Sequence, residues 1–328
     1  MRAIVLVGGE GTRLRPLTHT TPKPLLPVGN VPMIERVLAP FAAWGGLDGV
    51  VLSLGYKPDA FHAHFTDDRI GGLPVTYAVE PERMDTGGAI GFAAREAGVE
   101  GTFLVINGDV LTEIDLDRLV GVHRDRGAEA TVSLHPVDDP SRFGVVETTP
   151  DHRVVRFVEK PPPGEEPTNL ISAGTYVMEQ SVLERIPTGR PVSVERETFP
   201  ALVADGTLYA VVCHGYWLDT GTPEQYLEAN FDVMDGPVLA AEGATVAESA
   251  RVHHTVLGAA ASVGAGAVVE WSVLLPGARV EAEATISHSV VGADAVVGAG
   301  ASLTGHCVVA DRAKVDAGAS LVGEKVEA

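Results

Sequence analysis

Two patterns of hydrophobic and polar positions divide the chain. From residue 1 to about residue 235, short apolar runs alternate with amphipathic stretches, which is typical of a β-sheet with crossover helices. The predicted strands are 3–7, 49–54, 75–79, 102–106, 130–135, 154–158, 174–178 and 208–212, and the predicted helices are 33–44, 87–96, 116–126, 196–204 and 223–234. We therefore predict an α/β fold, a Rossmann-like domain over residues 1–236 with a mixed, mainly parallel sheet.

The pattern changes after this point to small residues with few aromatics. Apolar residues recur six positions apart in blocks: Val246 and Val252; Val263, Val269 and Leu275; Val280 and Ile286; then Val297, Leu303, Val309, Val315 and Leu321. A six-residue repeat is typical of a parallel β-helix, in which each unit turns its apolar residue inward. We predict a left-handed β-helix over residues 237–328. Its coil edges and apolar flanks favour a homo-oligomer.

A glycine-rich turn follows the first predicted strand. Gly8, Gly9 and Gly11 come directly after the apolar run 3–7, so the backbone amides of the turn can approach an anion closely. Two cations follow. Arg13 offers a planar guanidinium to phosphate oxygens, and Lys23 stands between two prolines and presents a compact charge. The spacing fits neither a Walker loop nor the dinucleotide fingerprint, and an ordinary glycine-rich turn is the alternative interpretation.

Two aspartates stand where the ends of strands are expected. Asp109 follows the buried run 103–106, and Asp219 precedes a helix start that Thr222 and Pro223 indicate. Ligands of open α/β sheets lie beyond the carboxyl ends of strands. A pair of carboxylates there suits Mg²⁺, which takes its remaining ligands from substrate phosphates. Taken alone, each aspartate is better explained as a turn or capping residue.

Charge and composition exclude several classes of protein. The 328 residues include 24 Lys and Arg against 44 Asp and Glu, a net charge of -20, which argues against a nucleic-acid or anionic-membrane surface. The two cysteines stand far apart and suggest neither a disulfide framework nor a zinc site. With no signal-peptide pattern and no apolar run near ~18 residues, we expect a cytoplasmic enzyme.

The glycine-rich turn belongs to a longer motif. Residues 8–24 match G-G-x-G-T-R-L-x-P-L-T-x-x-x-P-K-P at every specified position, and here the chain resembles the sugar-1-phosphate nucleotidyltransferases. Residues 193–200 and 216–223 are similar to segments of the mannose-1-phosphate guanylyltransferase branch. The resemblance implies transfer of GMP from GTP to mannose 1-phosphate, which yields GDP-mannose and pyrophosphate with Mg²⁺ as cofactor.

The resemblance also assigns roles to residues. The implied catalytic residues are Arg13, which binds the leaving pyrophosphate, Lys23, which stabilises the α-phosphate, and Asp109 and Asp219, which hold the metal. The implied nucleotide-binding residues are Leu6, Gly8, Gly9, Gly11, Thr12, Arg13, Glu80, Asp85 and Gly87. The residues implied to bind the sugar phosphate are Gly144, Glu159, Lys160 and Ser172.

Three positions bear on the choice of substrates. Glu80 favours guanine, because a carboxylate accepts hydrogen bonds from the donor-only edge of that base. Asp85 stands where the family has Gly, and Ser172 stands where mannose enzymes have Asn. Another nucleotide, glucose 1-phosphate or a cyclitol 1-phosphate therefore remain alternatives. So do a regulatory paralogue that binds nucleotide sugar without catalysis and, on the histidines of the repeat region, an acyltransferase.

Overall fold

The computed structural model describes residues 1–328, which pack as two compact units. The first unit comprises Met1–Gly9 and Val37–Trp217, and the second comprises Glu10–Arg36 and Leu218–Ala328. The glycine-rich motif is thus shared between the units. The predicted domain boundary between residues 236 and 237 stays a prediction.

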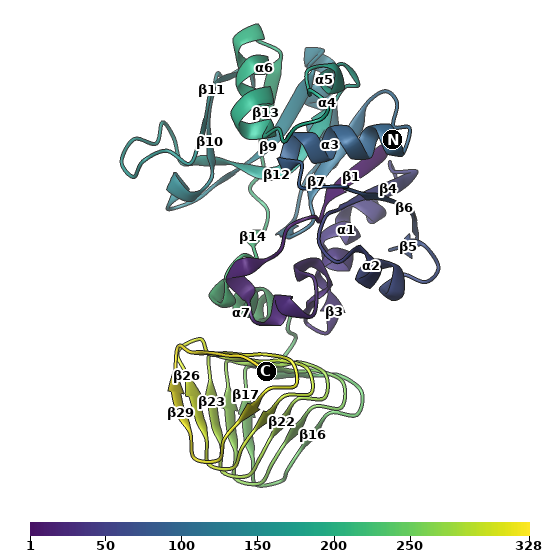
Figure 1. Ribbon diagram of the computed structural model, residues 1–328. Helices are drawn as coiled ribbons and strands as arrows, with labels where there is room; N and C mark the ends of the chain where they lie inside the picture. Colours follow the sequence, from purple (N-terminus) through teal and green to yellow (C-terminus); the bar gives the residue numbers. More distant parts are fainter. The chain divides into compact units, whose positions relative to one another are not determined.

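A mixed ten-stranded sheet forms the centre of the first unit (Figure 1). Its middle strands run in the order β7-β1-β4-β6 and are parallel, while β12 pairs antiparallel with β7, β9 and β10. The strands are β1 (Arg2–Leu6), β4 (Gly49–Leu54), β5 (Arg69–Ile70), β6 (Leu73–Val79), β7 (Phe103–Asn107), β9 (Ala130–Pro136), β10 (Gly144–Thr148), β11 (Val154–Glu159), β12 (Leu170–Met178) and β13 (Leu208–Val212). The short strands β8 (Val110–Thr112) and β14 (Trp217–Asp219) pair separately. The predicted α/β fold is confirmed.

Helices pack against this sheet through apolar faces. They are α2 (Pro58–His64), α3 (Asp85–Glu96), α4 (Leu116–Arg126), α5 (Ser181–Glu184) and α6 (Phe199–Asp205), and α1 (Met33–Trp44) begins in the second unit and continues into the first. The sequence did not predict α2 and α5. Within the predicted helix 196–204, the α-helix begins only at Phe199, after the π-helical turn η5 (Val194–Thr198). Pro200 lacks an amide hydrogen and therefore fits only the first turn of an α-helix.

The register of the parallel strands aligns their carboxyl ends. Leu6 of β1 pairs with Ser53 of β4 and with Asn107 of β7, and Leu54 of β4 pairs with Val79 of β6. The segments that follow these strands therefore share one edge of the sheet, which is where an open α/β sheet binds its ligands.

The second unit contains a β-helix of three parallel sheets (Figure 1). One sheet stacks β15 (Val238–Ala240), β18 (Thr255–Leu257), β21 (Val273–Leu274), β24 (Val290–Val291), β27 (Val308–Val309) and β30 (Lys325–Val326). The next stacks β16 (Thr245–Val246), β19 (Ser262–Val263), β22 (Arg279–Val280), β25 (Val296–Val297) and β28 (Lys314–Val315). The third stacks β17 (Arg251–His253), β20 (Val268–Glu270), β23 (Thr285–Ser287), β26 (Ser302–Thr304) and β29 (Ser320–Val322).

The six-residue repeat fills the interior of this β-helix. Val263, Val280, Val297 and Val315 occupy equivalent positions on successive coils and are all buried. Alanines such as Ala261 and Ala278 alternate with them in the same core. The periodicity seen in the sequence is therefore the packing repeat of the coil.

The second unit also contains most of the motif, residues 10–25, which we call the motif loop, and the helix α7 (Pro223–Asp232). The loop forms the 3-10 turns η1 (Thr12–Leu14), η2 (Leu17–His19) and η3 (Lys23–Leu25), followed by the hairpin of β2 (Pro27–Val28) and β3 (Val31–Pro32). Thr222 caps α7 in a capping box with Gln225, so the helix begins where the sequence predicted.

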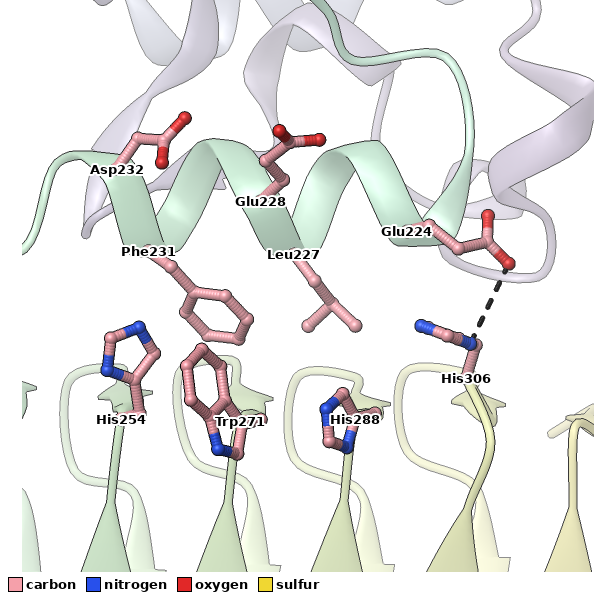
Figure 2. A pocket seen from close by; sticks show the side chains of 9 residues that line it. All are labelled: Glu224, Leu227, Glu228, Phe231, Asp232, His254, Trp271, His288 and His306. Atoms are coloured by element: carbon pink, nitrogen blue, oxygen red, sulfur yellow. Dashed lines mark ion pairs between the residues drawn. The ribbon is translucent and has the colours of Figure 1, made fainter.

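A row of rings faces α7 from one corner of the β-helix (Figure 2). His254, Trp271, His288 and His306 occupy this corner on successive coils, each with a positive φ. The ring of Phe231 on α7 lies 5.0 Å from that of His254 and 5.6 Å from that of Trp271. Figure 2 also shows the ion pair between His306 and Glu224 of α7, whose atoms are 3.9 Å apart. These histidines therefore face α7 across a pocket of about 400 Å³, which lies between the helix and this corner of the β-helix.

Candidate functional site

The nucleotide side of the predicted site lies along the sheet edge of the first unit. Glu80 follows β6, and a Cβ built on Gly8 would stand 3.1 Å from its Oε1 atom. Glu80 Oε1 accepts a hydrogen bond from the Ser53 hydroxyl (3.1 Å), and Oε2 accepts one from the Met84 amide (3.2 Å). The protein thus fixes the orientation of this carboxylate and leaves lone pairs on each oxygen for further donors. Because any side chain at position 8 would crowd the carboxylate, glycine suits that position.

Leu6 and Gly9 bracket this turn. Leu6 is the last residue of β1 and is half-buried, while Gly9 is exposed, with no atom within 4 Å of the position of a Cβ. The turn therefore leaves open space around its second glycine, as a turn that approaches a phosphate requires.

Asp109 lies at the same edge, in the turn between β7 and β8. The Gly108 amide donates a 3.0 Å hydrogen bond to the Leu6 carbonyl, and a Cβ on Gly108 would lie 2.3 Å from Val7. Only glycine fits this contact, so Asn-Gly-Asp holds the turn of Asp109 close to the turn that contains Gly8. Asp109 is partly buried and has interactions of its own.

The start of α3 explains the unusual aspartate at position 85. Asp85 has φ 58, in the left-handed region where glycine is favoured, and its carboxylate accepts a hydrogen bond from the Thr86 amide (2.9 Å). Gly87 is buried, and its amide donates a 2.7 Å hydrogen bond to the Val192 carbonyl. Aspartate tolerates the left-handed conformation better than most residues. The backbone of this loop therefore keeps the conformation that a glycine would adopt.

Three residues predicted to bind the sugar phosphate lie together: Gly144 begins β10, Glu159 ends β11, and Lys160 follows it directly. Gly144 pairs with Glu159 across the two strands, and a Cβ on Gly144 would stand 3.1 Å from Glu159 Oε2. Lys160 Nζ is 3.5 Å from Glu159 Oε1, and the lysine side chain is 59% exposed against 16% for the glutamate. The lysine ammonium thus lies beside the carboxylate, while most of the lysine side chain faces solvent.

Ser172 lies on β12, opposite Leu134 of β9. Its hydroxyl is 3.4 Å from the hydroxyl of Tyr176, and the pairing with β9 is irregular between these two residues. Gly174 has φ 83 within the irregular segment and packs against Asn107. The bulge therefore turns Ser172 and Tyr176, four residues apart, toward each other.

Glu195 also lies near this group, although no role was predicted for it. Its Oε2 atom accepts hydrogen bonds from the hydroxyls of Thr86 (2.6 Å) and Ser193 (2.8 Å), and so links η5 to the start of α3. Burial raises the pKa of the Glu159 carboxyl, and the negative charge of Glu195 raises it further. The position of Glu195 within a segment similar to guanylyltransferases was the available signal, but no local pattern indicates that its charge influences Glu159.

Trp217 is a second residue that sequence reasoning left without a role. Its indole N–H donates to the Ala173 carbonyl (3.0 Å), and its ring lies 5.6 Å from the ring of His135 and 5.5 Å from that of Phe143. The aromatic group therefore packs between β12 and the loop before Gly144.

In the second unit, the two cations of the motif, Lys23 and Arg13, lie beside Asp219. Lys23 Nζ lies 3.7 Å from Asp219 Oδ1, and Arg13 Nη2 lies 3.9 Å from Oδ2. A Cβ on Gly221 would stand 2.3 Å from Arg13 Nη2, so the guanidinium packs directly on the backbone of that glycine. Lys23 is buried, whereas the Arg13 side chain is 55% exposed. One carboxylate is thus flanked by two cations.

The turn before Arg13 supports this cluster. Gly11 has φ 61, and a Cβ there would stand 3.0 Å from both Lys23 and Thr18. The Thr18 hydroxyl donates to the Gly11 carbonyl (2.9 Å), while Thr12 begins η1 and is exposed. Glycine is therefore required at position 11 both for its conformation and for close packing against Lys23.

The residues predicted to hold a metal offer only carboxylate oxygens. Asp109 lies in the first unit and Asp219 in the second, and no cluster of three or more His, Cys, Asp or Glu side chains suits a metal ion. A donor set of two carboxylates fits Mg²⁺, which prefers oxygen and takes further ligands from phosphates and water. It does not fit a zinc site, which requires nitrogen or sulfur ligands in greater number.

Comparison with known proteins places these features in a family. Residues 2–236 match the Nucleotidyl transferase family, and residues 234–327 match the GMPPB C-terminal domain. The chain is 42% identical over 290 residues to the mannose-1-phosphate guanylyltransferase of Mycobacterium tuberculosis, covering 84% of this chain and 80% of that protein. It is 41% identical to the mannose-1-phosphate guanyltransferase of Aspergillus fumigatus over 69% of this chain and 62% of that protein.

The chain is also similar to a solved structure. The crystal structure of HddC from Yersinia pseudotuberculosis complexed with GMP-PN is 30% identical, with a TM-score of 0.61 over 71% of this chain and 99% of that one. None of the helices combines the length and apolarity that crossing a bilayer would require. The strand order, the motif at residues 8–24 and these matches agree, and the chain belongs to the Nucleotidyl transferase family, with a GMPPB-type C-terminal domain.

Proposed function

We propose that the protein makes GDP-mannose and pyrophosphate from GTP and mannose 1-phosphate. The observation that carries the proposal is the cluster of Lys23 and Arg13 around Asp219. Both charged residues that the motif specifies are therefore present, in a chain 42% identical to a mannose-1-phosphate guanylyltransferase. A regulatory paralogue without catalysis has no need of this complete set.

In the proposed reaction, an oxygen of the sugar phosphate attacks the α-phosphorus of the nucleotide. The bond between the α-phosphorus and the bridging oxygen breaks on the opposite side, and pyrophosphate leaves with that electron pair. Lys23 neutralises charge on the α-phosphate, and Arg13 binds the leaving pyrophosphate. Both roles rest on fixed cations, since the reaction requires positioning and charge neutralisation rather than a covalent enzyme intermediate.

Nucleoside triphosphate is proposed to bind over the glycine turn of Leu6, Gly8, Gly9, Gly11 and Thr12. Glu80 then accepts hydrogen bonds from the guanine edge, because both of its oxygens retain lone pairs after their contacts with Ser53 and Met84. Asp85 and Gly87 are proposed to border the nucleoside from the start of α3.

The metal in this proposal is Mg²⁺, held by Asp109 and Asp219 as carboxylate ligands. Bound there, it would neutralise phosphate charge and orient the triphosphate. Lys23 and Arg13 would lie beside the ion, since their cationic groups are 3.7 and 3.9 Å from the carboxylate oxygens of Asp219.

The acceptor is proposed to bind on β10, β11 and β12. Lys160 binds the sugar phosphate, and Glu159 accepts hydrogen bonds from sugar hydroxyls, with Gly144 leaving room beside it. Ser172 contributes a hydroxyl where mannose enzymes have an amide. This difference favours a second candidate for the acceptor, glucose 1-phosphate or a cyclitol 1-phosphate.

A substrate matrix tests the proposal. Five nucleoside triphosphates are combined with mannose, glucose and cyclitol 1-phosphates, and products are identified by mass. We expect GDP-mannose as the dominant product. A dominant product with another base or acceptor would correct the substrates, and no release of pyrophosphate from any pair would refute an enzymatic role.

We also propose a cytoplasmic homo-oligomer that binds neither nucleic acid nor membrane. The net charge of -20 disfavours anionic polymers and anionic lipid surfaces. Light scattering coupled to size-exclusion chromatography measures the oligomer directly, and a monomer at micromolar concentration would refute that part.

A further inference from the structure

The last coils of the β-helix contact the motif loop at three points. Lys325 Nζ on β30 donates a 3.0 Å hydrogen bond to the carbonyl of Arg13, across 312 residues of sequence. Glu327 lies 3.7 Å from the ring of His19, and the Thr20 hydroxyl donates to the Asp311 carboxylate. All of these residues belong to the second unit.

The contact with Arg13 joins the β-helix to the cation cluster. Lys325 holds the backbone carbonyl of Arg13, while Asp219 and the backbone of Gly221 hold its guanidinium. The side chain is 55% exposed, so little packing restrains it otherwise. An ammonium on the carbonyl of η1 therefore restricts the freedom of the residue that presents the guanidinium.

The contacts of Thr20 and His19 extend the support along the loop. Asp311 accepts the Thr20 hydroxyl with Oδ2 and the Ala293 amide with Oδ1 (2.8 Å), so its carboxylate is fixed to the preceding coil. Such a carboxylate is a rigid acceptor for the loop, because the stacked coils leave its backbone little freedom. The loop from Arg13 to Thr20 is thus anchored to three positions on the final coils.

We propose that the C-terminal coil of the β-helix is a positioning element for pyrophosphate binding, with Lys325 as the positioning residue for Arg13. This inference rests on the proposed function only in assigning pyrophosphate to Arg13. It gives the repeat domain a part in the active site, in addition to packing or oligomerisation.

The test compares Lys325→Met with Lys314→Met in the full-length protein. Lys314 lies on β28 of the preceding coil, is exposed and has no role in the motif loop, so it is a matched control. For Lys325→Met we expect the KM for the nucleoside triphosphate and the Kd for magnesium pyrophosphate to rise on the order of five- to tenfold. The KM for the sugar phosphate and the melting temperature should stay at wild-type values, because Lys325 is exposed.

Lys325→Arg should restore most of the lost affinity, since arginine keeps the charge and the donor. A second variant, Glu327→Gln, should produce a smaller rise in the same two constants. Wild-type values for Lys325→Met, or an equal effect of Lys314→Met, would overturn the inference.

Calorimetry with magnesium pyrophosphate keeps the two hypotheses separate. If the wild-type enzyme releases no pyrophosphate from any substrate pair, the proposed function fails while the binding comparison still tests Lys325. If the wild type is active and Lys325→Met binds pyrophosphate normally, only the positioning role fails.

Discussion

Lys23 Nζ lies 3.7 Å from Asp219 Oδ1, although the two residues come from opposite ends of the catalytic region of the sequence. The lysine is buried and the Asp219 side chain is only 17% exposed. At this burial the attraction between the two charges is stronger than on a surface. Arg13 adds a second positive charge at 3.9 Å, which supports the proposed binding of phosphate oxygens by this group.

Replacing Lys23 should remove most of the activity. We expect Lys23→Met to lower kcat by at least ~100-fold, as with the loss of other preorganised electrostatic groups. Steady-state pyrophosphate release measures this, with circular dichroism to verify folding and Lys314→Met as the control for loss of a lysine. A folded variant with near-normal turnover would contradict the role of Lys23 at the α-phosphate.

The two aspartates should set the requirement for magnesium. We expect Asp109→Asn and Asp219→Asn each to lower turnover by at least ~100-fold and to raise the Mg²⁺ concentration at half-maximal rate, because a neutral amide binds the cation more weakly. Removal of Mg²⁺ by a chelator should abolish turnover of the wild type. The exposed Asp316→Asn serves as the control. An unchanged Mg²⁺ titration in either site variant would argue against a shared ion.

Glu80 should govern the choice of base. Glu80→Gln replaces one acceptor oxygen by a donor, so we expect kcat/KM for GTP to fall by about tenfold or more, with a smaller change for the other triphosphates. Glu82→Gln, exposed two residues away, is the control. Equal losses for all bases would show that Glu80 acts on the loop rather than on guanine.

Asp85 should obstruct the nucleotide without being needed for the fold. Its φ of 58 already suits glycine, so Asp85→Gly should fold normally and lower the KM for the nucleotide about two- to fivefold by removing the side chain. Asp68→Gly offers a matched control, because Asp68 also has a positive φ of 51 but lies outside the predicted site. A higher KM in Asp85→Gly would instead assign the carboxylate a direct contact with substrate.

His123 should make stability depend on pH. Its side chain is 1% exposed between Thr131 and Glu179, and burial lowers its pKa below the value of about 6.5 expected in the unfolded chain. Between these two pKa values the unfolded chain binds the proton more tightly, so the free energy of unfolding rises with pH and levels off above about pH 6.5.

Denaturant titrations between pH 5 and 8 measure this effect. We expect His123→Asn to be less stable than wild type but to show a flatter dependence on pH, whereas His62→Asn, at an exposed position, should keep the wild-type slope. An unchanged slope in His123→Asn would mean that another group causes the dependence.

Much of the fold could be predicted because its signals are local. All eight predicted strands of the first unit are present, since a buried strand needs only a short apolar run between polar turns. The ends of helices were less certain. The π-helical turn before α6 has no periodic signal of its own, and α2 buries little apolar surface beyond Phe61.

The sequence alone determined the α/β sheet, the six-residue repeat of the β-helix and the motif of residues 8–24, because each is written in neighbouring residues. Only the tertiary structure decided that Asp219 stands between Lys23 and Arg13, that Glu195 raises the pKa of Glu159, and that Lys325 reaches the carbonyl of Arg13. These interactions join positions tens to hundreds of residues apart. They depend on how whole elements pack, which local propensity and spacing do not specify.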